Sequence, residues 1–277
     1  MLRELFYING SELEANGSGE ENLLLLLSEH LLSTVIYHPS KKEVFSWRVS
    51  ELPSELINQE DAVREYLTNQ SFLLNWKGKI DVVTITGRQS IVPLSLCNEY
   101  ELSSFAHLQF PSANEDQLMA DKDTETGLVV LYSINRTVLK VISTFFPDSV
   151  ITHVFHHYLK TTASENPLLH VNIVPSRCII TVQYKQKWQL LQSYQYNTGE
   201  DVLYLILKSM NQLGIDPDQA QVCVNGLVDR KSTLAQLLEQ YIPNLDWGGE
   251  LGYTYPEVDG FDKHSFSFID RILSCVS

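Results

Sequence analysis

Three histidines, His153, His156 and His157, gather in one short segment, and imidazole nitrogens are common zinc ligands. If this segment is helical, His153 and His157 share a face at a spacing that suits two metal ligands. A metal would need a third ligand, and the sequence nominates none. If His153 instead ends a β-strand, the histidines are ordinary packing or surface residues. A metal-dependent hydrolase centred on this segment is therefore one functional hypothesis.

The segment Trp247-Gly248-Gly249, with Gly252 close behind it, places glycines where main-chain amides could cradle a phosphate group. A Walker loop continues into Lys followed by Ser or Thr, and no such pair follows here. The sequence also contains no Gly-x-Ser-x-Gly nucleophile elbow. We therefore interpret the glycine-rich segment as a surface turn.

Acidic residues outnumber basic ones, 34 to 20, and give the chain a formal net charge of -14. A surface of this sign repels the phosphate backbone of nucleic acids unless a local basic patch overrides it. The basic residues occur singly or in pairs such as Lys41-Lys42 and Arg230-Lys231. We therefore predict no nucleic-acid partner. A protein partner of unknown identity and a homo-oligomer both stay open.

The sequence shows neither a secretion signal nor a membrane segment. The N-terminus lacks an apolar core of signal-peptide length before a small-residue cleavage site. The longest aliphatic run, Leu23–Leu27, is far shorter than the ~20 residues that a membrane helix needs. We therefore predict a cytoplasmic protein without a membrane span. The cysteines lie far apart, which favours reduced, mostly buried thiols over a zinc site: Cys97, Cys178, Cys223 and Cys275.

The first half of the chain contains elements in the order β-β-β-α-β. Apolar runs and a period-2 segment predict its strands at Leu23–Leu27, Leu31–His38, Val44–Ser50 and Ile80–Thr86. Before the last strand we predict a helix with Asn58 as its N-cap and with Glu60 and Asp61 in its first turn. The buried stripe of this helix comprises Val63, Tyr66, Leu67 and Leu74.

The second half repeats this order. Its strands are predicted at Leu168–Val174, Cys178–Tyr184, Trp188–Tyr196 and Gln221–Val224. Its helix begins after Thr198, the expected N-cap, and stops at Gly214. Matching elements of the two halves are offset by about 140–147 residues. This nearly constant offset indicates a duplicated domain.

A β-α-β unit is predicted between the two repeats. It comprises a strand at Val129–Ser133, a helix from Asn135 through Phe145, and a strand at Val150–Val154. A crossover of this kind implies parallel strands that pack against helices.

The boundary of the two domains is expected near Thr161–Asn166, which is short, polar and followed by a proline. The predicted domains are therefore residues 1–163 and 164–277. Within the first domain, residues 98–127 carry seven acids against one lysine. We interpret this segment as an exposed acidic insertion or a long loop.

Two helices are candidates for contact surfaces. The helix Asp201–Leu213 is apolar almost all round, so it is either sandwiched between a sheet and a neighbouring helix or part of an oligomer interface. The C-terminal stripe from Phe266 to Leu273 predicts a last core helix, and its position would also suit docking to a partner.

Three short motifs resemble a known family: Ile91-Val92-Pro93, Tyr132-Ser133-Ile134-Asn135 and Ile151-Thr152-His153. They look like a family of uncharacterised bacterial proteins that is grouped with actin-like ATPases. That family is similar to the cytoplasmic actin-like proteins of pilus assembly and type II secretion. The resemblance spans nearly the whole chain. It implies an α/β fold of duplicated ribonuclease-H-like (actin-like ATPase) domains, each a mixed five-stranded sheet flanked by helices.

The resemblance also implies a site for ATP and Mg²⁺ between the two halves. In actin-like ATPases each half offers a hairpin of the pattern Asp-x-Gly-x-Ser/Thr, whose turn amides hold phosphate and whose Asp positions the metal through water. The first hairpin here, Leu26 to His30, has neither the Asp nor the Gly, and its Glu29 would repel phosphate. The second has Asn172 where Asp belongs, and its Pro175 lacks the N–H that would bind phosphate.

On the adenosine side, the family's strand that ends in Gly-Gly is half present as Asn225-Gly226. A lone glycine after a strand usually just makes a turn. The remnant cofactor-binding residues would be Asn172, Ser176, Asn225 and Gly226, and we assign no catalytic residue and no metal ligand. A ribonuclease-H-type nuclease is also not expected, because the first strand of each half lacks the Asp that starts its metal site.

The degraded phosphate loops favour a non-catalytic actin-like scaffold or adaptor that acts through protein–protein contacts and needs no cofactor. The alternative is a divergent ATP-binding protein or phosphotransferase that uses the cleft between the halves, with ATP and Mg²⁺ as its cofactors.

Overall fold

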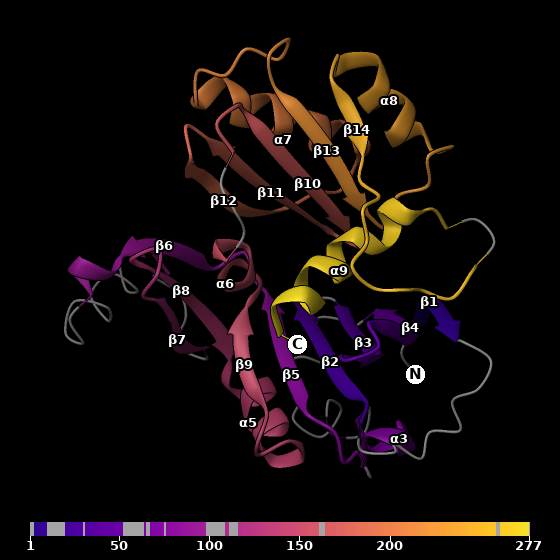
Figure 1. The fold of residues 1–277 in the computed structure, drawn as a ribbon. Coiled ribbons are helices and arrows are strands. Elements are labelled where there is room, and N and C mark those ends of the chain that lie inside the picture. Colours follow the sequence, from indigo (N-terminus) through magenta and orange to yellow (C-terminus); the bar gives the residue numbers. More distant parts are fainter. Residues whose placement is uncertain are drawn as a thin grey trace. The chain divides into compact units, whose positions relative to one another are not determined.

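The computed structural model describes residues 3–9, 20–29, 31–51, 64, 67–74, 76–97, 109–110, 116–160, 164–258 and 261–276 (Figure 1). The chain forms two compact units. Unit 1 comprises Met1–His156, Tyr253–Pro256 and Val276–Ser277, and unit 2 comprises His157–Gly252 and Glu257–Cys275. The predicted domain boundary between residues 163 and 164 stays a prediction, and residues 161–163 lie outside the described part of the chain.

The main sheet of unit 1 has six strands in the order β1-β4-β3-β2-β5-β9. The strands are β1 (Arg3–Asn9), β2 (Asn22–Ser28), β3 (Leu31–His38), β4 (Glu43–Glu51), β5 (Ile80–Ile85) and β9 (Val150–His153). The two pairs β2–β5 and β5–β9 are parallel, and the other pairs are antiparallel. The predicted mixed five-stranded sheet is thus present, and β1, which the sequence did not reveal, extends it by one edge strand.

The core of unit 1 lies on one face of this sheet, under α5 (Arg136–Phe145) and α3 (Ser71–Leu74). Leu23 and Leu25 of β2 point into it, while Leu24 and Leu26, which point to the other face, are buried as well. This explains the uninterrupted leucine run, because a central strand with a parallel neighbour is buried on both faces. Leu67 also joins the core. Of the predicted helix before it, Asn58, Glu60, Asp61, Val63 and Tyr66 lie outside the described residues.

Unit 1 also contains a three-stranded antiparallel sheet in the order β6-β8-β7. Its strands are β6 (Gln89–Pro93), β7 (Asp116–Asp123) and β8 (Leu128–Asn135), and a short 3-10 helix, η1 (Leu94–Leu96), follows β6. The prediction of a loop over residues 98–127 is therefore wrong for 116–123, which form β7. Residues 98–108 and 111–115 lie outside the described residues.

The acids of β7 explain this difference, because they accept hydrogen bonds instead of facing only water. Asp116 Oδ2 lies 2.6 Å from a guanidinium nitrogen of Arg88. Asp123 Oδ1 accepts the main-chain N–H groups of Glu125 and Thr126 in the turn to β8. Asp121 Oδ2 accepts the main-chain N–H of His153 at 2.6 Å.

The predicted β-α-β unit has its expected elements, but not the expected pairing. Asn135 caps α5, since its Oδ1 accepts the N–H groups of Thr137 and Val138 at 2.8 and 3.3 Å. β8 before the helix belongs to the three-stranded sheet, whereas β9 after it pairs in parallel with β5 of the main sheet. The crossover therefore connects two sheets, so β8 and β9 are not neighbours in one parallel sheet.

The sheet of unit 2 has five strands in the order β12-β11-β10-β13-β14. The strands are β10 (Leu168–Val174), β11 (Arg177–Tyr184), β12 (Lys187–Gln195), β13 (Gln221–Gly226) and β14 (Leu245–Trp247). β10 pairs antiparallel with β11 and parallel with β13, just as β2 pairs with β3 and β5 in unit 1. The duplication that the sequence predicted is therefore confirmed in the pairing of the strands.

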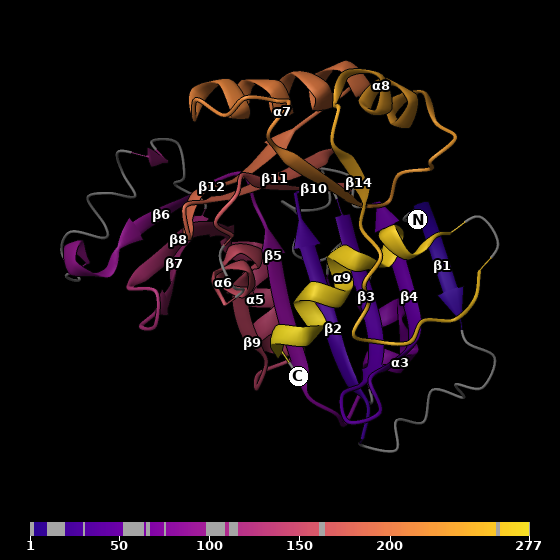
Figure 2. The same ribbon diagram turned by 45° about the horizontal axis from the view of Figure 1, so that its top comes forward.

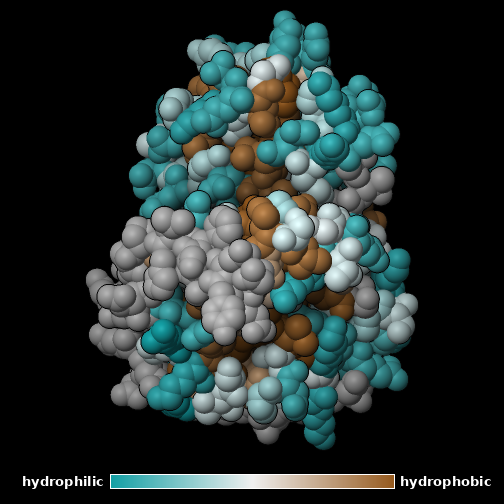
Figure 3. Space-filling model, turned by 90° about the vertical axis from the view of Figure 1, so that its left-hand side faces the viewer, coloured by the Kyte–Doolittle hydropathy of each residue, from teal (hydrophilic) through white to brown (hydrophobic). Residues whose placement is uncertain are grey.

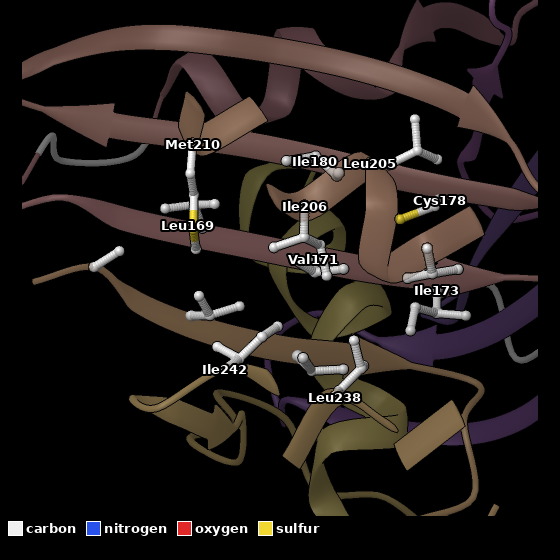
Figure 4. Close-up of a cluster of buried hydrophobic side chains, with 14 of the residues drawn as sticks. Leu169, Val171, Ile173, Cys178, Ile180, Leu205, Ile206, Met210, Leu238 and Ile242 are labelled. Carbon is white, nitrogen blue, oxygen red and sulfur yellow. The ribbon is translucent and has the colours of Figure 1, made fainter. Parts of the chain in front are cut away.

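Two helices, α7 (Gly199–Gln212) and α8 (Thr233–Tyr241), lie along one face of this sheet (Figure 2). As Figure 4 shows, Val171 of β10 and Ile180 of β11 point toward Ile206 of α7, and all three side chains belong to one buried cluster. Leu203 and Leu207 pack partly buried against this cluster. The apolar residues of α7 thus pack on the sheet and against α8 beside it, while Tyr204 is exposed.

The remaining helices are α6 (Val154–Leu159) and α9 (Lys263–Val276). The predicted stripe of the last helix is confirmed as buried: Phe266, Phe268, Ile269, Ile272 and Leu273. All four cysteines are free thiols, with Cys178 fully buried and the others partly exposed. No helix in the described ranges is both long and apolar enough to cross a bilayer. The face in Figure 3 is mostly hydrophilic where it belongs to described residues, with hydrophobic residues interspersed.

We predict that Ile206→Ala destabilises the protein strongly, because Ile206 is 0% exposed in the core of unit 2. Truncation of such a side chain removes about 2–5 kcal/mol from the free energy of unfolding. Tyr204→Ala on the same helix is the control, since Tyr204 is 61% exposed and its loss should cost less than about 0.5 kcal/mol. Urea denaturation measures both, and equal losses would contradict the packing described for α7.

We predict that Asp121→Asn stabilises the protein at neutral pH. Burial raises the pKa of Asp121 from 3.8 to about 6, against the lowering effect of the hydrogen bonds from His153 and Tyr132. The folded state therefore holds a proton that the unfolded state releases, and the free energy of unfolding falls as pH rises from about 4 to about 6. The amide keeps an acceptor oxygen without the charge, so about 1–3 kcal/mol should be regained at pH 7.

The measurement is urea denaturation of the wild type and Asp121→Asn between pH 4 and pH 8. The two proteins should converge toward pH 4, where Asp121 is protonated. Asp148→Asn, at an exposed position, is the control for removing one negative charge. A gap between wild type and Asp121→Asn that stays constant over the whole pH range would contradict a raised pKa.

Candidate functional site

The residues predicted to hold a nucleotide in unit 2 lie at the ends of β10 and β13. These strands are parallel, and Asn172 is the register partner of Asn225 while Ile173 is the partner of Gly226. The two asparagine side chains are 1% and 4% exposed. The fold thus brings three of the four predicted residues together, because parallel strands end at the same edge of a sheet.

Ser176, the fourth residue, lies beyond them in the β10–β11 turn. Its φ of 63° is left-handed, and its carbonyl oxygen accepts the main-chain N–H of Tyr196 at 3.3 Å. Pro175 precedes it and contributes no N–H. The turn therefore has one main-chain N–H fewer than a turn without proline.

The two asparagines differ in how their side chains are bonded. Asn225 Nδ2 donates to the carbonyl oxygen of Cys223 at 3.5 Å, and the thiol of Cys223 lies 3.7 Å from Asn225 Oδ1. Asn172 Nδ2 is buried and has no hydrogen-bond partner among the residues that the structure describes. Neither amide carries the negative charge with which a carboxylate attracts a divalent cation.

Gly226 has a structural reason to be glycine. Its φ is 95°, and a Cβ atom there would lie 2.2 Å from the carbonyl oxygen of Ile173. That oxygen accepts the N–H of Leu227 at 2.8 Å, which ties the end of β13 to β10. The close approach of the two strands therefore accounts for this glycine without a ligand.

Gly248, which the sequence analysis placed in a surface turn, belongs to the same site. Its N–H donates to the carbonyl oxygen of Val224 at 3.1 Å, and so it continues the pairing of β14 with β13. A Cβ atom at Gly248 would lie 1.8 Å from Asn225 Oδ1. The Gly-Gly run after Trp247 was the signal for this position, and Gly248 is a partly exposed residue directly after β14.

The matching site in unit 1 contains a bound carboxylate of the chain itself. Ser28 at the end of β2 pairs with Ile85 at the end of β5, so the turn after β2 lies beside the segment after β5. Glu29 Oε1 accepts the main-chain N–H of Gly87 at 3.2 Å and the hydroxyl of Thr86 at 3.3 Å. An anion therefore already occupies these donors. His30 of the same hairpin lies outside the described residues.

The histidine segment is split between two elements. His153 is the last residue of β9, and His157 lies on α6, so the premise of a shared helical face is wrong. His153 Nδ1 accepts the N–H of Phe155 at 3.2 Å. In the described part of the chain, no three His, Cys, Asp or Glu side chains are grouped to hold a metal ion. The alternative reading, in which His153 ends a strand, is confirmed.

We predict that Gly226→Ala lowers the free energy of unfolding by at least about 2 kcal/mol. The new Cβ would clash with main-chain atoms of Ile173, and the positive φ is unfavourable for alanine. Gly249→Ala is the control, because the nearest atom to its Cβ would be 3.5 Å away in the side chain of Lys263. Chemical denaturation measures both. A loss below about 0.5 kcal/mol for Gly226→Ala would contradict the close contact between β13 and β10.

Two solved structures are similar to the whole chain. A Bacteroides thetaiotaomicron protein with an actin-like ATPase fold and unknown function is 15% identical, with a TM-score of 0.75, and the match covers 96% of this chain and 100% of that one. The PilM-PilN type IV pilus biogenesis complex is 12% identical, with a TM-score of 0.57, and the match covers 93% and 99%. At these identities the likeness shows the fold, which is that of actin-like ATPases with duplicated ribonuclease-H-like domains.

A comparison with curated proteins finds no match to the sequence. A family model described as a protein of unknown function, DUF3822, matches residues 10–245, which includes both sets of repeated strands. The expectation of an uncharacterised family with the actin-like ATPase fold is therefore confirmed, and the chain belongs to the DUF3822 family.

Proposed function

We propose that this protein is a non-catalytic, actin-like scaffold or adaptor that acts through protein–protein contacts. The observation that carries this proposal is the hydrogen bonding of Glu29 to Gly87 and Thr86. A nucleotide phosphate that used these donors would have to displace a carboxylate and overcome its charge. The carboxylate of Glu29 thus already uses the donors in unit 1 at which a phosphate would bind.

The hairpin of unit 2 supports the same proposal. An amide replaces a carboxylate at Asn172, and Pro175 removes one main-chain N–H from the turn. Gly226 is explained by strand contact. Asn172 and Pro175 therefore lack groups that would bind ATP, and Gly226 has a structural role.

A role through protein contacts is consistent with one relative. PilM, which shares the fold at 12% identity, was solved in complex with the protein PilN. We take from it only that this fold can carry a protein-binding surface. The partner of the present chain is to be identified by capture from the source cell.

The second candidate function is a divergent ATP-binding protein or phosphotransferase. It is favoured by one observation, the unpartnered amide nitrogen of Asn172 beside Asn225 and Gly226. A phosphate oxygen could accept a hydrogen bond from this nitrogen. Mg²⁺ and ATP would be the cofactors in that case.

We predict that the wild type shows no saturable thermal shift with ATP or ADP up to millimolar concentration, with or without Mg²⁺. A ligand at 100 times its Kd stabilises a protein by about 2.7 kcal/mol, which moves the melting midpoint by a few degrees. Asn172→Ala and the matched Asn197→Ala, at an exposed position, are titrated in parallel. A Mg²⁺-dependent shift that Asn172→Ala alone abolishes would overturn the scaffold proposal and establish the second candidate.

A further inference from the structure

The sheet of unit 2 has a second face, opposite the one that α7 and α8 cover. Side chains alternate along a strand, so Leu169, Val171 and Ile173 face the core while His170 and Asn172 face the other way. Thr181 of β11 is the register partner of His170, and Ser193 of β12 is the partner of Ile179, two residues before Thr181. Four polar side chains therefore lie on this second face.

Three of these side chains are buried without a hydrogen-bond partner in the part of the chain that the structure describes. The atoms are Thr181 Oγ1, Ser193 Oγ and Asn172 Nδ2, in residues that are 0%, 3% and 1% exposed. Buried polar groups are nearly always hydrogen-bonded, and exceptions often mark a ligand or water site. Thr181 and Asn172 both neighbour His170 on this face, whereas the buried side chain of Ile179 separates Asn172 from Ser193. The two exceptions beside His170 indicate a site for a bonding ligand.

A positive charge lies next to this site. Arg271 of α9 places Nη2 3.2 Å from Nε2 and 3.3 Å from Nδ1 of His170, and its Cζ lies 5.0 Å from the ring centroid of Tyr158. Burial and the guanidinium lower the pKa of His170 to about 3, so this imidazole is neutral at physiological pH. Two neutral rings thus hold the guanidinium.

Among the residues that the structure describes, no carboxylate lies within ion-pair distance of the Arg271 guanidinium. Asp270, the preceding residue, accepts the N–H of Gly252 at 2.9 Å. Asp246 lies two strands away from His170, as the register partner of Cys223 on the strand between them, and it is exposed. The guanidinium therefore keeps N–H donors for a ligand.

We propose that the second face of the unit-2 sheet binds a small anion with a carboxylate or phosphate group. Its oxygens would accept hydrogen bonds from Arg271, from the hydroxyl of Thr181 and from the amide of Asn172. The class of ligand follows from the excess of donors and from the planar guanidinium, which matches the oxygens of both groups. Water would satisfy the hydroxyl but would not neutralise Arg271. The site is independent of the proposed scaffold function.

The test is a thermal-shift titration of the full chain with inorganic phosphate and, separately, with succinate, at constant ionic strength set by potassium chloride. We expect a saturable rise of the melting midpoint with one of the two anions, and the active anion identifies the ligand group. Arg271→Met should raise the apparent Kd of the active anion at least about tenfold. Arg230→Met is the matched control, because Arg230 also stacks on an aromatic ring, that of Trp247 at 5.4 Å, away from the second face.

A second variant keeps the test valid if Arg271→Met does not fold. Thr181→Val removes only the hydroxyl, which has no partner among the described residues, and so it should fold normally and weaken binding about threefold to tenfold. The proposal is overturned if neither anion gives a saturable shift, which is the outcome for a site that holds only water. It is equally overturned if the shift persists unchanged in Thr181→Val.

Discussion

One central strand in each unit fixes where every residue of the candidate sites can lie. β2 and β10 each pair antiparallel with the next strand and parallel with a later one. The turn of the hairpin and the end of the parallel strand therefore meet at one edge of each sheet. This is why Glu29 reaches Gly87 in unit 1 and why Asn172 lies beside Asn225 in unit 2.

The sequence predicted these central strands because they are apolar enough to be recognised in isolation, and the resemblance to actin-like ATPases implied their pairing. The run Leu23–Leu27 and the alternation of Leu169, Val171 and Ile173 need no knowledge of their neighbours. The contact of Glu29 with Gly87 could not be predicted in the same way, because it depends on the side-chain conformation in one turn. The same glutamate that sequence reasoning treated as a source of repulsion is a hydrogen-bond acceptor within its own unit.

The three-stranded sheet of unit 1 shows where the sequence pattern misleads. Asp116, Asp121 and Asp123 make β7 look like a solvated loop, since strands are poor in aspartate. Each of these carboxylates instead accepts a hydrogen bond, from Arg88, from His153 and from the turn at Glu125. Arg88 and His153 are distant in sequence from the aspartates that they bind, so a local pattern does not reveal these two hydrogen bonds. β1 was missed for a related reason, because an edge strand with exposed Leu5 and Tyr7 has no clear alternation.

Side chains of β10 point alternately to the core of unit 2 and to the face on which we propose a ligand. Residues 169, 171 and 173 hold the core, whereas His170 and Asn172 lie on the opposite face. An amide in place of a carboxylate at position 172 therefore changes what the unit can bind without removing a core contact. The same reasoning applies to Thr181, which is fully buried and whose hydroxyl has no hydrogen-bond partner among the described residues. Valine has nearly the same size and would fill this strand position without a buried hydroxyl. A buried hydroxyl without a hydrogen bond lowers the free energy of unfolding by about 1–3 kcal/mol, and a ligand that accepts its hydrogen bond offsets that loss.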